Sequence, residues 1–239
     1  MDTETITLQT GDGPMECFEA RPEGAERAVI VIQEAFGVND HIKDVTTRFA
    51  GEGYRAIAPA LFHRSGGGTA PYDDFSKVMP LLEGFTDDGA LMDVDATIAH
   101  LEGAGFGAGR VGIVGFCMGG RVSFLVSVRR ALGAGVGFYG GGIVTPRFPG
   151  QAKLVDEAAS LRTPWLGLFG DRDGSIPVDD VEALRGALDR APVDHDVVRY
   201  PESEHGFFCD LRPSYHAQAA ADAWPRTLEW FAKHLGGGA

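Results

Sequence analysis

A short glycine-rich turn between two apolar segments constrains this chain more than any other feature. It reads Gly115-Phe116-Cys117-Met118-Gly119-Gly120. Residues 110–114 before it are typical of a buried strand, and residues 121–130 after it carry the apolar pattern of a mostly buried helix. A strand that turns into a helix within so few residues holds its turn residue in a strained conformation, and flanking glycines let the two backbones approach closely. The pattern is therefore that of a nucleophile elbow, with cysteine in place of serine.

Cys117 would lie at the N-terminus of the helix that follows the turn. The partial positive charge of a helix N-terminus favours a thiolate over a thiol, and a thiolate is the reactive form of cysteine. The alternative is a buried structural cysteine beside a tight turn. Six residues alone do not separate these two interpretations, because short motifs recur by chance.

Length, charge and cysteine content limit the kind of protein this is. The 239 residues, of which 44% are hydrophobic, predict one large α/β domain over residues 1–239. A formal net charge of −13 repels phosphate backbones and anionic lipid, which excludes nucleic acid and membrane partners. Three cysteines cannot all pair within the chain. Together with the lack of a secretory signal or a bilayer-length apolar run, this predicts free thiols in a cytoplasmic protein.

Alternating strand and helix patterns predict the fold class. Two short strands are expected at 5–8 and 15–20, and later strands at 28–32, 54–58, 110–114, 134–139, 165–169 and 194–200. Helices are expected at 42–51, 88–101, 121–130, 178–188 and 214–234. Consecutive strands joined by helices imply a mostly parallel sheet. Residues 60–75 form a loop that is either a lid or merely flexible, and residues 143–160 are an excursion of uncertain form.

The loops that follow the strands carry the candidate functional groups, since open α/β sheets keep their ligand sites at the carboxyl ends of parallel strands. Glu34 follows the strand at 28–32, where it is either an active-site carboxylate or a solvated loop acid. In this architecture the same loop supplies one backbone N–H of an oxyanion hole. Tyr139 ends another strand and either faces the site or lies in the core.

Cys117, an aspartate pair and His205 follow three different strands. Their order along the chain, nucleophile, acid and then histidine, is that of an α/β-hydrolase triad. Among the seven histidines, His205 is the one that follows the last core strand in a glycine-flanked loop. The pattern alone does not choose between Asp171 and Asp173.

With these features the chain resembles the dienelactone hydrolase family of the α/β-hydrolase superfamily, nearly end to end. The matching segments are Gln33-Glu34-Ala35-Phe36-Gly37-Val38-Asn39, the elbow, Phe138-Tyr139-Gly140, Gly170-Asp171-Arg172-Asp173 with Pro177, and His205-Gly206-Phe207. The resemblance implies an α/β-hydrolase fold, a three-layer sandwich in which helices cover both faces of a mostly parallel central sheet. It also implies Cys117 as nucleophile, His205 as base and Asp173 as orienting acid.

The resemblance places further residues around this triad. Glu34 would lie next to the thiol, and the N–H groups of Met118 and Ala35 would form the oxyanion hole. We expect the apolar walls of the substrate site to be Phe36, Tyr139 and Phe207.

One part of the family pattern is missing. The family's type enzyme grips the substrate carboxylate with two arginines, one of them four residues after the catalytic histidine. Here that position is Cys209, and residues 65–109, where the other arginine would fall, contain no arginine. Arg212 is a candidate replacement for one of the two contacts.

These residues predict hydrolysis of a small-molecule ester or lactone through a thioester acyl-enzyme. A thiol, with a pKa of about 8.5, is expelled far more readily than an alkoxide, whose conjugate acid resembles water at about 15.7. Enol esters, unsaturated lactones and thioesters are therefore the expected substrates. The reaction needs no metal or organic cofactor, and we expect a monomer or small homo-oligomer. The alternatives are a non-catalytic ligand-binding protein with an idle triad, and a redox-responsive protein in which Cys117 pairs with Cys209.

Overall fold

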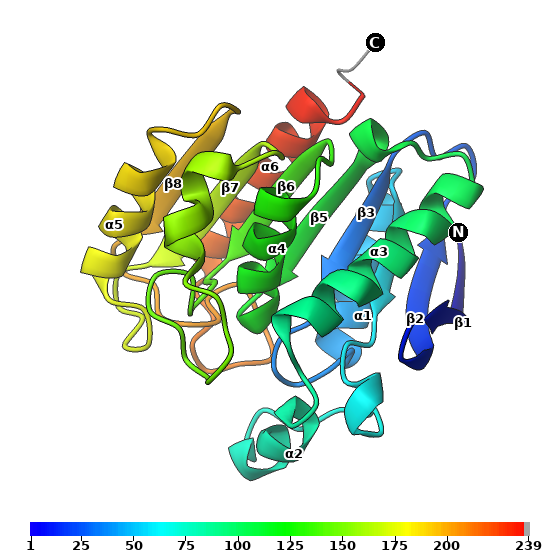
Figure 1. Ribbon diagram of the computed structural model, residues 1–239, viewed down its shortest axis with the longest axis horizontal. Coiled ribbons are helices and arrows are strands. Elements are labelled where there is room, and N and C mark those ends of the chain that lie inside the picture. Colours follow the sequence, from blue (N-terminus) through cyan, green and yellow to red (C-terminus); the bar gives the residue numbers. More distant parts are fainter. Residues whose placement is uncertain (237–239) are drawn as a thin grey trace.

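Eight strands form one sheet in the computed structural model, which describes residues 1–236 (Figure 1). Their order across the sheet is β1-β2-β4-β3-β5-β6-β7-β8. Strands β3 to β8 run parallel, whereas β2 pairs antiparallel with β1 on one side and with β4 on the other. The strands are β1 (Asp2–Thr10), β2 (Gly13–Arg21), β3 (Ala28–Ile32), β4 (Arg55–Pro59), β5 (Val111–Phe116), β6 (Ala134–Phe138), β7 (Trp165–Gly170) and β8 (His195–Tyr200). The predicted mostly parallel sheet is confirmed.

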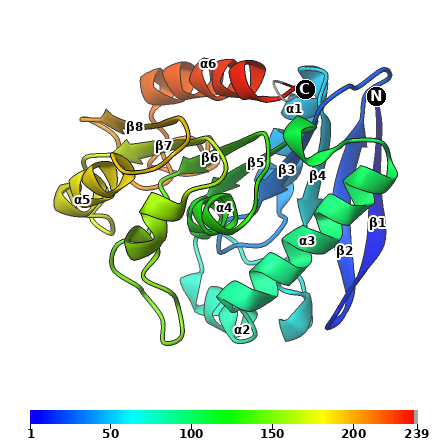
Figure 2. The ribbon, with the colours of Figure 1, turned by 45° about the horizontal axis from the view of Figure 1, so that its top comes forward.

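Helices cover both faces of the sheet, so the molecule has three layers (Figure 2). One face carries α1 (Asp40–Gly51) and α6 (Ala217–His234). The other carries α3 (Asp87–Gly103), α4 (Met118–Arg129) and α5 (Val178–Leu188). Shorter pieces are α2 (Val78–Leu82) and single 3₁₀ turns at His63–Ser65, Phe75–Lys77, Ala108–Arg110 and Leu154–Ser160. The three-layer α/β arrangement is the one expected.

The central strands are buried on both faces, which explains their unbroken apolar sequences. Every residue of β3 and every residue of β5 is buried. The antiparallel strands β1 and β2 are nine residues each, longer than the segments 5–8 and 15–20 that were predicted. Their ends are polar, and they pair through contacts such as that of Arg21 with Asp2 at 2.9 Å. Apolar alternation therefore does not mark where these strands stop.

Residues 60–86 leave the sheet at the carboxyl ends of its strands and include α2 (Figure 1). Salt bridges fix this segment near both of its ends. The guanidinium of Arg64 donates to both carboxylate oxygens of Asp93 on α3, at 2.7 and 2.9 Å. At the other end Asp87 accepts from the buried guanidinium of Arg121 on α4, with the longer contact at 2.9 Å. That residues 60–75 of this segment move as a lid stays a prediction.

Within residues 1–236 no helix combines the length and the apolar character that crossing a membrane requires.

Close backbone contacts at the elbow explain why Gly115 and Gly119 have no side chain. A Cβ atom on Gly115 would overlap the carbonyl oxygen of Gly119, and one on Gly119 would come within 2.5 Å of the carbonyl oxygens of Ile32 and Gln33. The first turn of α4 is thus pressed against both β5 and β3. It also contains two glycines, which are poor helix formers, and this explains why the predicted helix began at 121 rather than at Met118.

We expect Gly115→Ala to destabilise the fold by about 3 kcal/mol or more, because the methyl group cannot fit without parting β5 from α4. Gly103→Ala is the matched control. Gly103 lies in α3 with open space around its Cβ position, and alanine there should stabilise by up to about 1 kcal/mol. Urea unfolding curves of both variants test this, and equal midpoints would contradict the close approach.

Candidate active site

Cys117 occupies a strained backbone position at the end of β5. It is the N-cap of α4 with φ 56° and ψ −117°, and in residues 1–236 the only other non-glycine residue with positive φ is Tyr139. Such strain persists only where the surroundings hold it. Here the Cys117 N–H donates to the carbonyl of Phe138 at 3.0 Å, while its own carbonyl accepts from Gly120 at 3.0 Å. The elbow geometry expected from the sequence is therefore present.

The thiol of Cys117 is partly exposed and lines a cavity of about 390 Å³. Parallel pairing brings the loops around it together, because Ile32 lies opposite Gly115, and Phe116 opposite Phe138, at the strand ends. Of the predicted site residues, the cavity lining contains Cys117, His205, Met118, Ala35 and Phe36. Arg212 lines it as well.

His205 and Asp173 form a short hydrogen bond behind the cavity. Nδ1 of His205 lies 2.6 Å from Oδ2 of Asp173. The pKa of Asp173 is below its usual value, since burial raises it but the hydrogen bond and charge of His205 lower it by more. The aspartate is thus ionised, and Nδ1 of His205 carries the proton that it donates. Asp171, the other acid left open by the sequence, instead accepts two hydrogen bonds from Arg199 at 2.7 and 2.8 Å.

Cys117 and His205 line the same cavity, and each shifts the pKa of the other. Burial raises the pKa of the Cys117 thiol, but the positive charge of His205 and their hydrogen bond lower it by more, so the pKa lies below its usual value. The N–H of Met118 also lowers it. Conversely, burial lowers the pKa of His205, while the thiolate and Asp173 raise it above its usual value. This arrangement favours a thiolate–imidazolium pair.

Glu34 is fully buried beside this pair. Its carboxylate accepts a hydrogen bond from the Tyr72 hydroxyl at 2.7 Å and one from Arg212 at 3.3 Å. The negative charge of Glu34 raises the pKa of the Cys117 thiol and so opposes His205. The Arg212 guanidinium also lies over the rings of Phe36 and Tyr72, with its central carbon 5.7 and 5.5 Å from their centroids. Arg212 thus reaches the cavity, although it follows His205 by seven residues.

Met118 and Ala35, the predicted oxyanion donors, both line the cavity with Cys117. Met118 opens α4, and its N–H lies close enough to affect the Cys117 thiol. Ala35 lines the cavity, and within residues 1–236 its N–H donates no hydrogen bond to another backbone or side-chain group. The N-terminus of α4 favours negative charge nearby, and the role of these two N–H groups as oxyanion donors stays a prediction.

Two of the three predicted apolar walls lie elsewhere. Phe36 lines the cavity, but Tyr139 and Phe207 are fully buried and are not among its lining residues. The Tyr139 ring packs edge-on against the His205 ring, with centroids 5.1 Å apart, and the Phe207 ring lies 5.3 Å from Tyr139. Gly206, with φ 79°, turns the chain so that His205 meets the cavity while the next side chain enters the core. These two aromatic residues therefore support the histidine from behind.

Three residues of the site were not singled out from the sequence. The N–H and Oγ of Ser175 donate to Oδ1 of Asp173 at 2.8 and 2.7 Å, and the spacing Asp-x-Ser is a turn signal that would have indicated this contact. Arg147 lines the cavity and donates to the Ser175 carbonyl at 2.6 Å. Arg147 and Tyr72 both lie in irregular segments, whose position depends on tertiary contacts and not on any local pattern.

All three cysteines are free thiols. Cys17 and Cys209 are buried, whereas Cys117 is partly exposed. Burial raises the pKa of Cys17 to about 12 and that of Cys209 to about 11. Only Cys117 among the three cysteines therefore combines access with a lowered thiol pKa. Within residues 1–236 no three potential metal-ligating side chains gather into a group.

We expect iodoacetamide to alkylate Cys117 with a pH midpoint below that of a free thiol, about 8.5. His205→Gln should move the midpoint up by about one unit or more, because burial and the Glu34 charge then act unopposed. Glu34→Gln should move it down, because the charge that raises the thiol pKa is gone. Mass spectrometry of the labelled chain at each pH gives the three midpoints. Identical midpoints in all three proteins would contradict the coupling.

Comparison with known proteins agrees with this architecture. The model of the Dienelactone hydrolase family matches residues 15–235. A Salmonella typhimurium protein named "Putative carboxymethylenebutenolidase" is 40% identical over 230 residues, which cover 93% of this chain and 84% of that protein. The carboxymethylenebutenolidase of Pseudomonas putida is 32% identical over 238 residues, or 97% of each chain.

Solved structures show the same relationship. The crystal structure of "Putative Dienelactone Hydrolase from Klebsiella pneumoniae" superposes with a TM-score of 0.88 at 38% identity, covering 97% of this chain and 98% of that one. An esterase of Pyrococcus furiosus, at 16% identity and a TM-score of 0.74 over 99% of this chain and 91% of that one, shares the fold. This chain therefore belongs to the dienelactone hydrolase family, and it is a hydrolase with an α/β-hydrolase fold that acts on esters or lactones.

Proposed function

We propose that this hydrolase cleaves activated esters and lactones through a Cys117–His205–Asp173 triad and a thioester acyl-enzyme. The observation that carries the proposal is the position of His205. Its ring lies between the accessible thiol and a buried carboxylate, and Nδ1 is engaged by Asp173 at 2.6 Å. Nε2 is therefore the nitrogen left to exchange a proton at the cavity.

The first step is attack of the Cys117 thiolate on the substrate carbonyl carbon. The lowered pKa of the thiol increases the fraction of this nucleophile at any given pH. Negative charge then develops on the carbonyl oxygen, and the N–H groups of Met118 and Ala35 stabilise it. Removing one such donor from a hydrolase typically costs about 10²–10³ in kcat.

The leaving group decides which substrates complete this step. The tetrahedral intermediate expels either the Cys117 thiolate or the substrate's own leaving group. An ordinary alkoxide leaves poorly against a thiolate, since the conjugate acids differ by about seven pKa units. An enolate or a second thiolate leaves readily. This supports enol esters, unsaturated lactones and thioesters as the substrate class.

Deacylation returns the enzyme to its starting state. As the enolate or thiolate leaving group departs, it takes the Nε2 proton of the His205 imidazolium, and the ring becomes neutral. Nε2 then takes a proton from water, whose oxygen attacks the thioester carbonyl. Collapse releases the carboxylic acid and the Cys117 thiolate and restores the thiolate–imidazolium pair. Asp173 fixes the tautomer and orientation of the ring, while Ser175 binds the other carboxylate oxygen of Asp173. Tyr139 packs against the ring and limits its movement.

Glu34 would set how much thiolate the resting enzyme holds. Its carboxylate, held by Tyr72 and Arg212, raises the thiol pKa that His205 lowers. The redox-responsive alternative gains no support, because Cys117 and Cys209 are both free thiols and burial raises the pKa of Cys209.

We expect Cys117→Ala to lower kcat/KM for vinyl acetate, an enol ester, by about 10³-fold or more, since the acyl acceptor is absent. Cys17→Ala, on β2, is the control and should keep the activity of the native enzyme. Hydrolysis followed by pH-stat gives both values. Unchanged turnover in purified Cys117→Ala would refute the nucleophile.

We also expect the leaving group to dominate the choice among acetates. The enzyme should cleave vinyl acetate and S-phenyl thioacetate at least about 10²-fold faster than ethyl acetate at equal concentration, because ethoxide cannot displace the thiolate. If the relative enzymatic rates of the three acetates only follow their relative rates of spontaneous hydrolysis, the result would contradict a thioester intermediate. Intact-mass analysis after rapid quenching should show an acetyl group on Cys117.

A further inference from the structure

A second cavity adjoins the active-site cavity, and no step of the proposed reaction uses it. It has a volume of about 640 Å³ and lies between residues 76–87 and residues 148–151. Leu82, Phe148 and Gln151 belong to the linings of both cavities, so these three side chains form the partition between them. A substrate as small as an acetyl ester would leave the second cavity empty.

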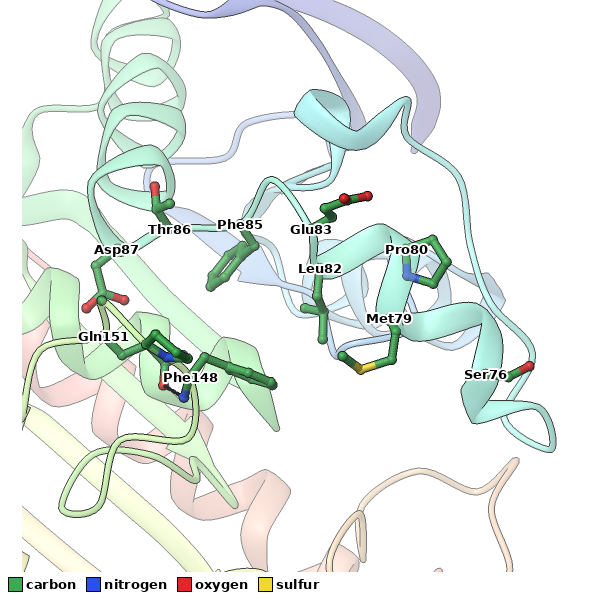
Figure 3. Close-up of a pocket in the computed structure, with 12 residues that line it drawn as sticks. Ser76, Met79, Pro80, Leu82, Glu83, Phe85, Thr86, Asp87, Phe148 and Gln151 are labelled. Carbon is green, nitrogen blue, oxygen red and sulfur yellow. Dashed lines mark hydrogen bonds between the residues drawn. The ribbon is translucent and has the colours of Figure 1, made fainter.

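Apolar side chains face this second cavity from both sides. Figure 3 shows Leu82, Phe85 and Met79 directed into the space from the α2 segment, with Phe148 facing them from the other side. Glu83 points away from Phe148 (Figure 3). Asp87 is engaged by Arg121 and by the Ala152 N–H at 2.9 Å, so its charge is already compensated. The space thus suits an uncharged group.

Exposed apolar residues gather at the same place. Seven large apolar side chains are exposed in residues 1–236, and three of them line one or both cavities: Phe75 at 60%, Met79 at 52% and Phe148 at 44%. Single exposed apolar residues need no explanation, but a group of them around a hollow marks a binding surface.

The partition is also easy to displace. Phe148 is nearly half exposed, and its segment is held by hydrogen bonds from the N–H groups of Arg147 and Phe148 to the side-chain oxygen of Gln151, at 3.0 and 3.2 Å. Those bonds fix the backbone of the turn and leave the Phe148 ring free to change rotamer.

We infer that the second cavity binds an uncharged aromatic or branched-alkyl substituent of the substrate, while the ester carbonyl lies at Cys117. This inference rests on the proposed function, and it narrows the substrate class to esters or lactones that carry a bulky apolar group within a few bonds of the carbonyl. Met79, Leu82, Phe85 and Phe148 are then specificity-determining residues. Carboxylate-bearing substituents are disfavoured there, because none of the residues that line this cavity within residues 1–236 is a lysine or arginine that could pair with them.

Three enol esters test the inference and show which side of the ester enters the cavity. Vinyl acetate has no bulky group, vinyl 3-phenylpropanoate carries a phenyl ring on the acyl side, and 1-phenylvinyl acetate carries it on the leaving side. Met79→Trp fills the second cavity from a half-exposed position, and Met79→Glu introduces a charge there. Met92→Trp is the matched control, since Met92 is 36% exposed on α3 and lines neither cavity.

We expect both Met79 variants to lower kcat/KM for at least one phenyl-bearing ester by on the order of tenfold, with vinyl acetate changed less than about twofold. Met92→Trp should leave all three values within about twofold. Equal effects of a Met79 variant on all three esters, or no effect on either phenyl ester, would overturn the inference.

A binding measurement separates this inference from the proposed reaction. Calorimetry gives the Kd of 4-phenylbutan-2-one, an uncharged analogue of the phenylpropanoate ester, for Cys117→Ala with and without Met79→Trp. We expect the second substitution to weaken binding about tenfold, and an unchanged Kd would refute a role for the second cavity on the acyl side. If native enzyme cleaves no enol ester while the Kd responds as expected, the chemistry assigned to Cys117 fails and the binding site stands.

Discussion

The structure depends on how closely the first turn of α4 packs against β5 and β3. At this point three backbones meet, and glycine at 115 and 119 is what lets the carbonyl oxygens of one element approach the Cα atoms of another. The cost is a positive φ at Cys117, whose side chain is thereby aimed at the cavity. The same packing fixes the N-terminus of α4 beneath the thiol and aligns the loops after β3, β7 and β8 around it. Cys117, His205 and Ala35 thus line one cavity, because the parallel strands that they follow end at the same edge of the sheet.

Charge around the thiol is balanced rather than simply positive. His205 stabilises the thiolate, Glu34 opposes it, and each is held by a further group: Asp173 for the histidine, and Tyr72 with Arg212 for the glutamate. Because all of these groups are partly or fully buried, their interactions are only weakly screened by solvent. Arg212 also explains how a chain with cysteine at position 209 still presents a guanidinium to its site.

Local patterns in the sequence were sufficient to predict most of the framework. The apolar run at 28–32 and the helix at 178–188 have the predicted bounds, since burial on both faces and a clear helical stripe leave little ambiguity. The lengths of β1 and β2 were underestimated, because polar residues form much of the pairing between these two strands. Cys117 and His205 line one cavity and Asp173 bonds His205, because their loops follow parallel strands that end at the same edge of the sheet. In contrast, Tyr139 and Phe207 are buried behind His205. The backbone turn at Gly206 decides whether the next side chain enters the cavity or the core, and the sequence pattern does not show that turn. Nothing local indicates that Tyr72 contacts Glu34, which is 38 residues away along the chain.

The two salt bridges that bound residues 64–87 have an evolutionary consequence. The salt bridge of Arg64 with Asp93 holds the beginning of this segment against α3. The salt bridge of Asp87 with Arg121 holds its end against α4, one helical turn after Cys117. Everything between these anchors hangs outside the layered framework. Apart from Tyr72, which holds Glu34, the intervening loop can accordingly be lengthened, shortened or exchanged, so that a lineage could acquire new substrates without rebuilding the sheet and the loops that follow its strands.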